Sequence, residues 1–141
     1  MRDRGKTLGR LLRVRTLQLN LVQAEEARAH EKFASEAALK TRIAQLADAV
    51  APAPTASEDG FAFVAAAHFR ERLHRSAEAA DMRLRAAEQG IEQAAEKTRE
   101  ARRDQNAIEK LMARAEAEAA LKALRALEAA PAVRKIRHDP C

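Results

Sequence analysis

Three short stretches of this sequence carry side chains of the kind that bind phosphate or metal ions. Gly5-Lys6-Thr7 has the last residues of a phosphate-binding loop, but that loop also needs an earlier glycine and a strand, which the chain begins too late to supply. His30-Glu31 is half of a zinc-protease helix motif, yet Ala34 stands where the second histidine would be. His68 and His74, six residues apart, fall on different faces of a helix. We therefore expect no nucleotide or other small-molecule ligand, no metal and no cofactor.

Carboxylates are abundant, as in Glu25-Glu26 and in the pair Glu116 and Glu118, but nothing in the sequence sets them up for catalysis. A catalytic carboxylate needs a concave pocket that raises its pKa. Long charged segments more often form a solvated helix face with partners four residues away. We expect a protein that is not an enzyme.

The segments that carry these side chains have strong helical character. From Phe61 to Ala130 there is no proline and one interior glycine, Gly90, in a sequence rich in Ala, Glu, Arg and Leu. Pro52 and Pro54 interrupt the pattern, because proline breaks a helix. The sequence predicts a helix over about residues 6–50, a turn over 51–56, a helix over about 57–130 and a basic tail over 131–141.

Apolar residues in both predicted helices recur at alternating steps of three and four, the spacing of coiled coils. In the first helix this track holds Leu8, Leu12, Leu19, Val22, Ala29, Phe33, Ile43, Ala47 and Val50, with polar Arg15, Glu26, Glu36 and Lys40 among them. In the second it holds Phe69, Leu73, Ala77, Ala80, Leu84, Ala87, Ile91, Ala94, Thr98, Ala101, Gln105, Ile108, Met112, Ala115 and Ala119. We expect an all-α fold: one domain spanning residues 1–141, formed by a long two-helix antiparallel coiled-coil hairpin with unequal arms.

The short break also suggests the register of the hairpin, meaning which residues of the two helices lie opposite each other. If Val50 and Ser57 flank the turn, equal rise places Ile43 opposite Val64 and Leu8 opposite about Thr98. The second helix then has no partner beyond about Ala101. Apolar residues past that point are expected to meet another protein or a second copy of the chain: Ile108, Leu111, Met112, Leu121, Leu124 and Leu127.

Composition narrows the class of protein further. The 141 residues are 33% charged and 3% aromatic, with no Trp or Tyr, which suits a thin helical seam better than a globular core. No apolar stretch is long enough to span a bilayer, and arginines interrupt the one stretch that could form a signal-peptide core. Cys141 is the only cysteine, which favours a reducing cytoplasm.

The net charge of +5 favours acidic partners, and the N-terminal segment concentrates basic residues. This cluster can be either a solvated terminus or an electrostatic contact. The near absence of aromatic residues removes the stacking platforms of single-strand binders, so we expect no nucleic acid. The cluster consists of Arg2, Arg4, Lys6, Arg10, Arg13 and Arg15.

The whole pattern resembles the FliJ family of flagellar type III export proteins. The resemblance rests on the chain length, on two unequal helices with a short break, on the start Leu11-Leu12-Arg13-Val14-Arg15, and on the late segment from Asp104 to Arg114. It covers nearly the whole chain. The chain differs from the family pattern in its high alanine content and its longer, proline-containing turn.

The resemblance implies a non-catalytic component of the export apparatus, at the cytoplasmic face of the cell membrane. It implies a central stalk in the hexameric flagellar export ATPase, coupled to the cytoplasmic domain of the membrane export gate through the region from Phe33 to Leu73, and binding to export chaperones. The alternatives are a coiled-coil adaptor or a self-assembling structural rod. The partner-binding residues implied at the ATPase ring are Leu11, Arg13, Arg15, Gln105, Ile108, Leu111, Met112 and Arg114.

Overall fold

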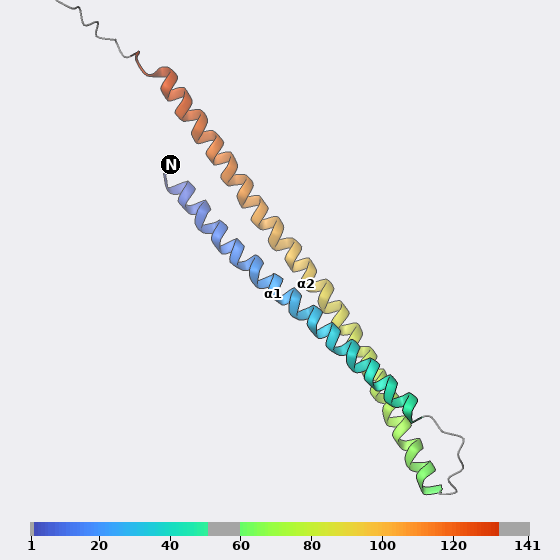
Figure 1. Cartoon of the computed structure of the whole chain (residues 1–141). Helices are drawn as coiled ribbons and strands as arrows, with labels where there is room; N and C mark the ends of the chain where they lie inside the picture. Colours follow the sequence, from blue (N-terminus) through green and yellow to red (C-terminus); the bar gives the residue numbers. More distant parts are fainter. Residues whose placement is uncertain (1, 51–59, 133–141) are drawn as a thin grey trace, which may run out of the picture. The chain divides into compact units, whose positions relative to one another are not determined.

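The computed structural model describes residues 2–50 and 60–132. Helix α1 spans Arg2–Ala49 and helix α2 spans Gly60–Ala129 (Figure 1). The predicted fold class is confirmed: the two helices, of 48 and 70 residues, pack against each other in an all-α antiparallel hairpin with unequal arms. The predicted turn, the start of the second helix at residue 57 and the tail from residue 133 lie outside the described residues.

Helix α1 begins at Arg2, four residues before the predicted start. Asp3 lies in its first turn, where the helix dipole stabilises a carboxylate. Thr7 donates a hydrogen bond from Oγ1 to the carbonyl oxygen of Asp3, at 2.7 Å. The acidic residue in the first turn therefore supports the earlier start.

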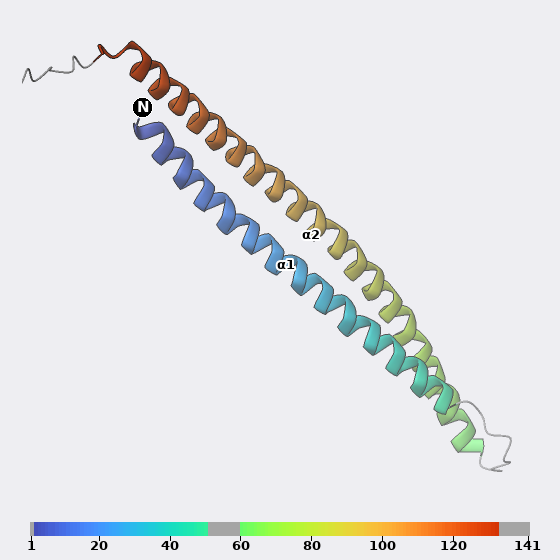
Figure 2. The same ribbon diagram turned by 45° about the horizontal axis from the view of Figure 1, so that its top comes forward.

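The chain divides into two compact units, and each contains a stretch of both helices. We call Met1–Thr16 with Arg103–Cys141 the terminal unit, and Leu17–Arg102 the hairpin unit. In each unit the stretch of α1 runs beside the stretch of α2 (Figures 1 and 2). The buried residues of the described chain all belong to the hairpin unit: Leu19, Ile43, Leu73, Ala80, Ala87, Ala94 and Thr98.

The seam of the hairpin unit, meaning the positions where its two helix stretches meet, follows the predicted heptad track. On α2, Leu73, Ala80, Ala87 and Ala94 are buried at steps of seven residues. Thr98 is buried on the same track and satisfies its hydroxyl by donating to the carbonyl oxygen of Ala94, at 3.1 Å. Because alanine side chains are small, this face of α2 allows a close approach of α1.

Ion pairs between the helices fix the register of the hairpin unit. Glu25 pairs with Lys97 at 3.7 Å, Glu36 with Arg83 at 3.1 Å, and Lys40 with Asp81 at 2.6 Å. The partner number on α2 falls as the number on α1 rises, as an antiparallel pair requires. Glu36 and Lys40 are polar residues on the α1 track, and both form ion pairs with α2.

The predicted register is wrong by about two heptads. The pair of Lys40 with Asp81 places Ile43 level with about Ala77 and not with Val64. In the terminal unit Leu8 lies with Met112, fourteen residues beyond the predicted Thr98. The prediction assumed that both helices end flush at the break.

Helix α2 in fact runs on past the end of α1. The observed register in the hairpin unit places Val50 level with about Arg70, so the first ten residues of α2 have no stretch of α1 beside them. Phe69, which the sequence placed on the track, is accordingly 45% exposed.

The register also shortens the predicted overhang, meaning the stretch of α2 that extends beyond the start of α1. Ile108 and Met112 are half-buried in the terminal unit, so the prediction that they lack a partner in the chain is wrong. The register places the start of α1 level with about Glu118. Three leucines of the predicted overhang lie beyond that point, exposed by 48%, 53% and 74%: Leu121, Leu124 and Leu127.

Candidate functional site

The terminal unit brings together both stretches that the family resemblance singles out. Arg15 donates a hydrogen bond from Nη1 to Oδ2 of Asp104 at 3.0 Å, with which it also forms an ion pair. One residue further along each helix, Gln105 donates from Nε2 to Oγ1 of Thr16 at 3.3 Å. These contacts tie residues 11–15 of α1 to residues 104–114 of α2. All eight predicted partner-binding residues therefore lie in one unit.

The eight residues divide by exposure into two groups of four. Leu11 and Leu111 are 43% and 46% exposed and can offer apolar surface to a partner. Ile108 and Met112 are half-buried, so they support the packing of the unit more than its outer surface. The exposed group is Leu11, Arg13, Leu111 and Arg114, and the half-buried group is Arg15, Gln105, Ile108 and Met112.

Val14 belongs to the stretch that carries the family resemblance but is not among the eight predicted partner-binding residues, although it is 50% exposed in the terminal unit. Val14 and Leu11 are three residues apart, so they share one face of α1. Both stand off the heptad track. An apolar residue off the track is the signal that could have identified this outer surface, because the track accounts for the packing against α2.

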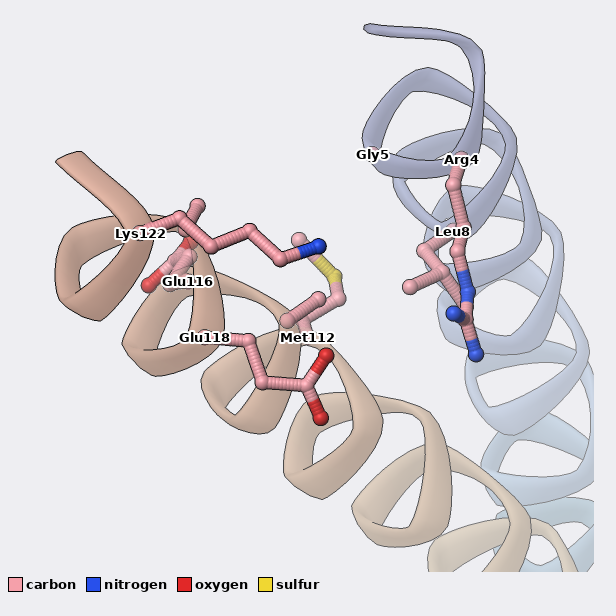
Figure 3. A pocket seen from close by; sticks show the side chains of 9 residues that line it. Arg4, Gly5, Leu8, Met112, Glu116, Glu118 and Lys122 are labelled. Atoms are coloured by element: carbon pink, nitrogen blue, oxygen red, sulfur yellow. The ribbon is translucent and has the colours of Figure 1, made fainter. Parts of the chain in front are cut away.

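A groove of about 440 Å³ lies between the two helices of the terminal unit (Figure 3). Leu8 of α1 and Met112 of α2 point into it (Figure 3). A Cβ atom added to Gly5 would meet no other heavy atom within 4 Å, so the helices are not tightly packed here. The remaining lining residues are Arg4, Ala115, Glu116, Glu118, Ala119 and Lys122.

The groove has an apolar floor and charged residues of both signs around it. Leu8, Met112 and the two alanines supply the floor, while Arg4, two glutamates and Lys122 supply the charges. This combination suits the apolar face of a partner helix, whose flanking charges can pair at the edges. The groove is a site that the sequence did not predict, since it depends on how far apart two helix ends lie.

Basic side chains form a separate exposed surface on α1. Lys6, Arg10 and Arg13 line one shallow depression of the terminal unit together with Gly9. Their side chains are exposed, so their attraction for an acidic partner is screened by salt over about 8 Å. This surface can steer an encounter, while the apolar groove and leucines can supply the buried area of a complex.

The stretches considered above for phosphate or metal binding are all helical in the structure. Gly5-Lys6-Thr7 lies inside α1, where the backbone amides serve the helix and cannot cradle a phosphate. His74 pairs with Glu78 one turn away, at 3.3 Å. Among residues 2–50 and 60–132, no group of three or more His, Cys, Asp or Glu side chains is placed to hold a metal ion.

Comparison with protein-family models, curated proteins and solved structures found no match to this chain. Within the described part of the chain, neither helix combines the length and the apolar character that crossing a membrane requires.

Proposed function

We propose that this protein is a non-catalytic component of the flagellar type III export apparatus. It acts as the central stalk of the hexameric export ATPase and couples that ring to the membrane export gate. The proposal is supported by the family resemblance of residues 11–15 and 104–114 and by the helical hairpin, which is the architecture that the resemblance implies.

The observation that carries the proposal is the pairing of these two stretches in the terminal unit. They are 89 residues apart in sequence where Arg15 meets Asp104, yet they form one surface with Leu11 and Leu111 exposed on it. Two stretches that the resemblance assigns to the same partner are thus close enough to bind it together. The terminal unit binds the ring, and the region from Phe33 to Leu73 in the hairpin unit contacts the export gate. The protein also binds export chaperones.

The test measures the binding affinity of the full chain for the cognate export ATPase by isothermal titration calorimetry. Leu11→Ser and Leu111→Ser remove exposed apolar area, so each should weaken binding by about 1–3 kcal/mol while helicity and thermal stability stay unchanged. Ala113→Ser, at an exposed neighbouring position, is the matched control and should bind normally. Undiminished binding by the double leucine variant would refute the proposed surface.

Ile108→Ser separates binding from folding. Because Ile108 is half-buried, this variant should lower the free energy of unfolding, which Leu111→Ser should not. If Leu111→Ser destabilises the chain as much as Ile108→Ser does, the exposed group is part of the packing and the proposed surface is wrong.

A self-associating coiled coil is the second candidate function. It is favoured by Leu121, Leu124 and Leu127, which are exposed beyond the part of α1 that the structure describes. Leu124→Ser should then reduce the sedimentation coefficient at high protein concentration and leave ATPase binding intact. A chain that stays monomeric at all concentrations rules this candidate out.

A further inference from the structure

A second line of residues runs along the face of α2 that is turned away from α1 in the terminal unit. At about 100° per residue, all of these residues lie within about 40° of the direction of Lys110. Met112 and Ala119, which line the groove beside α1, lie on the opposite side of the helix. Every residue of the line is exposed, and we call it the outer stripe: Lys110, Arg114, Ala117, Leu121, Leu124 and Glu128.

The outer stripe has the spacing of a coiled-coil seam. Its residues are separated by alternating steps of four and three, which keep one face of a helix turned towards a partner helix. Helix α1 does not fill this role, because in the terminal unit it packs on the opposite face of α2. Leu121 and Leu124 are 48% and 53% exposed, so the stripe offers apolar area to a helix from outside the chain.

The outer stripe is complementary to itself when a second copy lies antiparallel to it. With residue 119 at the two-fold axis, Lys110 of each copy faces Glu128 of the other, so opposite charges meet at both ends. Ala117 faces Leu121, so a small side chain lies opposite a large one on both sides of the axis. A two-fold dimer uses the same surface on both copies, and therefore requires a surface that matches its own reverse.

A parallel arrangement of two outer stripes is less favourable. Lys110 would then face Lys110, Arg114 would face Arg114 and Glu128 would face Glu128, and like charges repel. In the antiparallel arrangement Arg114 faces Leu124 and can cover it with its apolar stem while the guanidinium stays in water. The order of charges along the stripe, basic at its start and acidic at its end, therefore favours antiparallel pairing.

We propose that two copies of the chain associate through their outer stripes in an antiparallel, two-fold symmetric dimer. The leucines supply the apolar area, and the pairs of Lys110 with Glu128 set direction and register. This inference rests on the second candidate function, self-association, and specifies the face of α2 that mediates it. Arg114, one of the eight predicted partner-binding residues, is covered in this dimer, so self-association competes with any other partner of that residue.

The test measures the dissociation constant of the full-chain dimer by sedimentation equilibrium at low ionic strength, where exposed ion pairs are least screened. Lys110→Glu and Glu128→Lys should each raise it about tenfold, because each places like charges together at both ends of the dimer. The variant with both substitutions restores opposite charges and should return the constant close to its original value. Glu116→Lys makes the same charge change about 120° around the helix from Glu128, and should have little effect.

The possible failures are distinguishable. A chain that stays monomeric at all concentrations removes both the self-association candidate and this interface. If the chain self-associates and neither single charge variant weakens it, self-association stands, but it uses another surface or a parallel pairing, and the antiparallel dimer is wrong. If both single variants weaken association and the double variant does not restore it, Lys110 and Glu128 do not face each other. All of these positions are exposed, and circular dichroism checks that each variant keeps its helicity.

Discussion

A single salt bridge, between Lys40 and Asp81, links the ionisation of one carboxyl group to the packing of the two helices. A hydrogen bond from the Lys40 ammonium, 2.6 Å away, holds the pKa of Asp81 below its usual range, and the charges of Lys40 and Arg85 add to this effect. A carboxyl group whose pKa is lowered on folding stabilises the folded state above its unfolded pKa, and this contribution is lost as the pH falls through the folded pKa. Both side chains are largely exposed, so the contribution is small.

We expect an NMR titration to show the Asp81 pKa below that of a typical exposed aspartate. Lys40→Met should raise it towards the usual range, because the hydrogen bond and the charge of Lys40 are both lost, leaving desolvation, which raises the pKa, and the charge of Arg85, which lowers it. Lys32→Met, which removes another exposed lysine of α1, is the control and should leave the Asp81 pKa unchanged. If Lys40→Met also leaves it unchanged, the pair does not persist in solution.

Gly90 is a residue whose replacement should stabilise the protein. It lies in the interior of α2 without a positive φ angle, and an added Cβ atom would meet no other heavy atom within 4 Å. Gly90→Ala should therefore raise the free energy of unfolding by about 0.5–1 kcal/mol, because alanine loses less backbone entropy in a helix. Urea unfolding measures the change. A loss of stability would mean that the helices approach more closely at Gly90 than the structure indicates.

At the scale of the helices, the alanine positions of α2 limit the volume of the seam. Ala87 is 4% exposed, whereas its neighbour Ala86 is exposed. Ala87→Leu should cost about 1–3 kcal/mol, since extra atoms must force the helices apart. Ala86→Leu adds the same atoms on the outside and should change stability by no more than about 0.5 kcal/mol. Urea unfolding measures both changes. Equal effects of the two substitutions would contradict the placement of Ala87 on the buried face of α2 and of Ala86 on its exposed face.

The heptad spacing predicts which residues meet but not which turns face each other. Leu19, Ile43, Leu73 and the three buried alanines were all on the predicted tracks. The register, in contrast, was wrong by about two heptads, because a shift by whole heptads again places apolar residues on apolar residues. Charge pairs such as Glu36 with Arg83 differ between these alternatives, but each contributes little free energy, so the spacing pattern did not single out the observed register.

For the candidate site, too, the sequence predicted which stretches meet but not which of their residues are exposed. The family resemblance selected residues 11–15 and 104–114, which the structure places together through Arg15 and Asp104. Which members are exposed depends on the register, so Ile108 was expected to be free and is half-buried. The groove beside Leu8 depends on the separation of the helices, which no residue spacing encodes.

At the scale of the whole molecule, burial is distributed unevenly between the units. The hairpin unit contains every buried residue of the described chain, and the terminal unit packs through half-buried residues only. Local opening should therefore cost less free energy in the terminal unit. Hydrogen exchange followed by mass spectrometry should show slower exchange around Ala80, Ala87 and Ala94 than around Ile108 and Met112. Uniform protection along α2 would show that the two units open as one.

The charged residues on the heptad track of α1 also restrict how two copies of the chain could recognise each other. Arg15, Glu36 and Lys40 find opposite charges on α2, at Asp104, Arg83 and Asp81. If two α1 helices ran side by side in the same direction and register, each of these side chains would face its own twin, and like charges repel. A parallel, in-register pair of α1 helices is therefore disfavoured. Exchange of α1 between two chains would instead keep each of these side chains beside its opposite charge on α2.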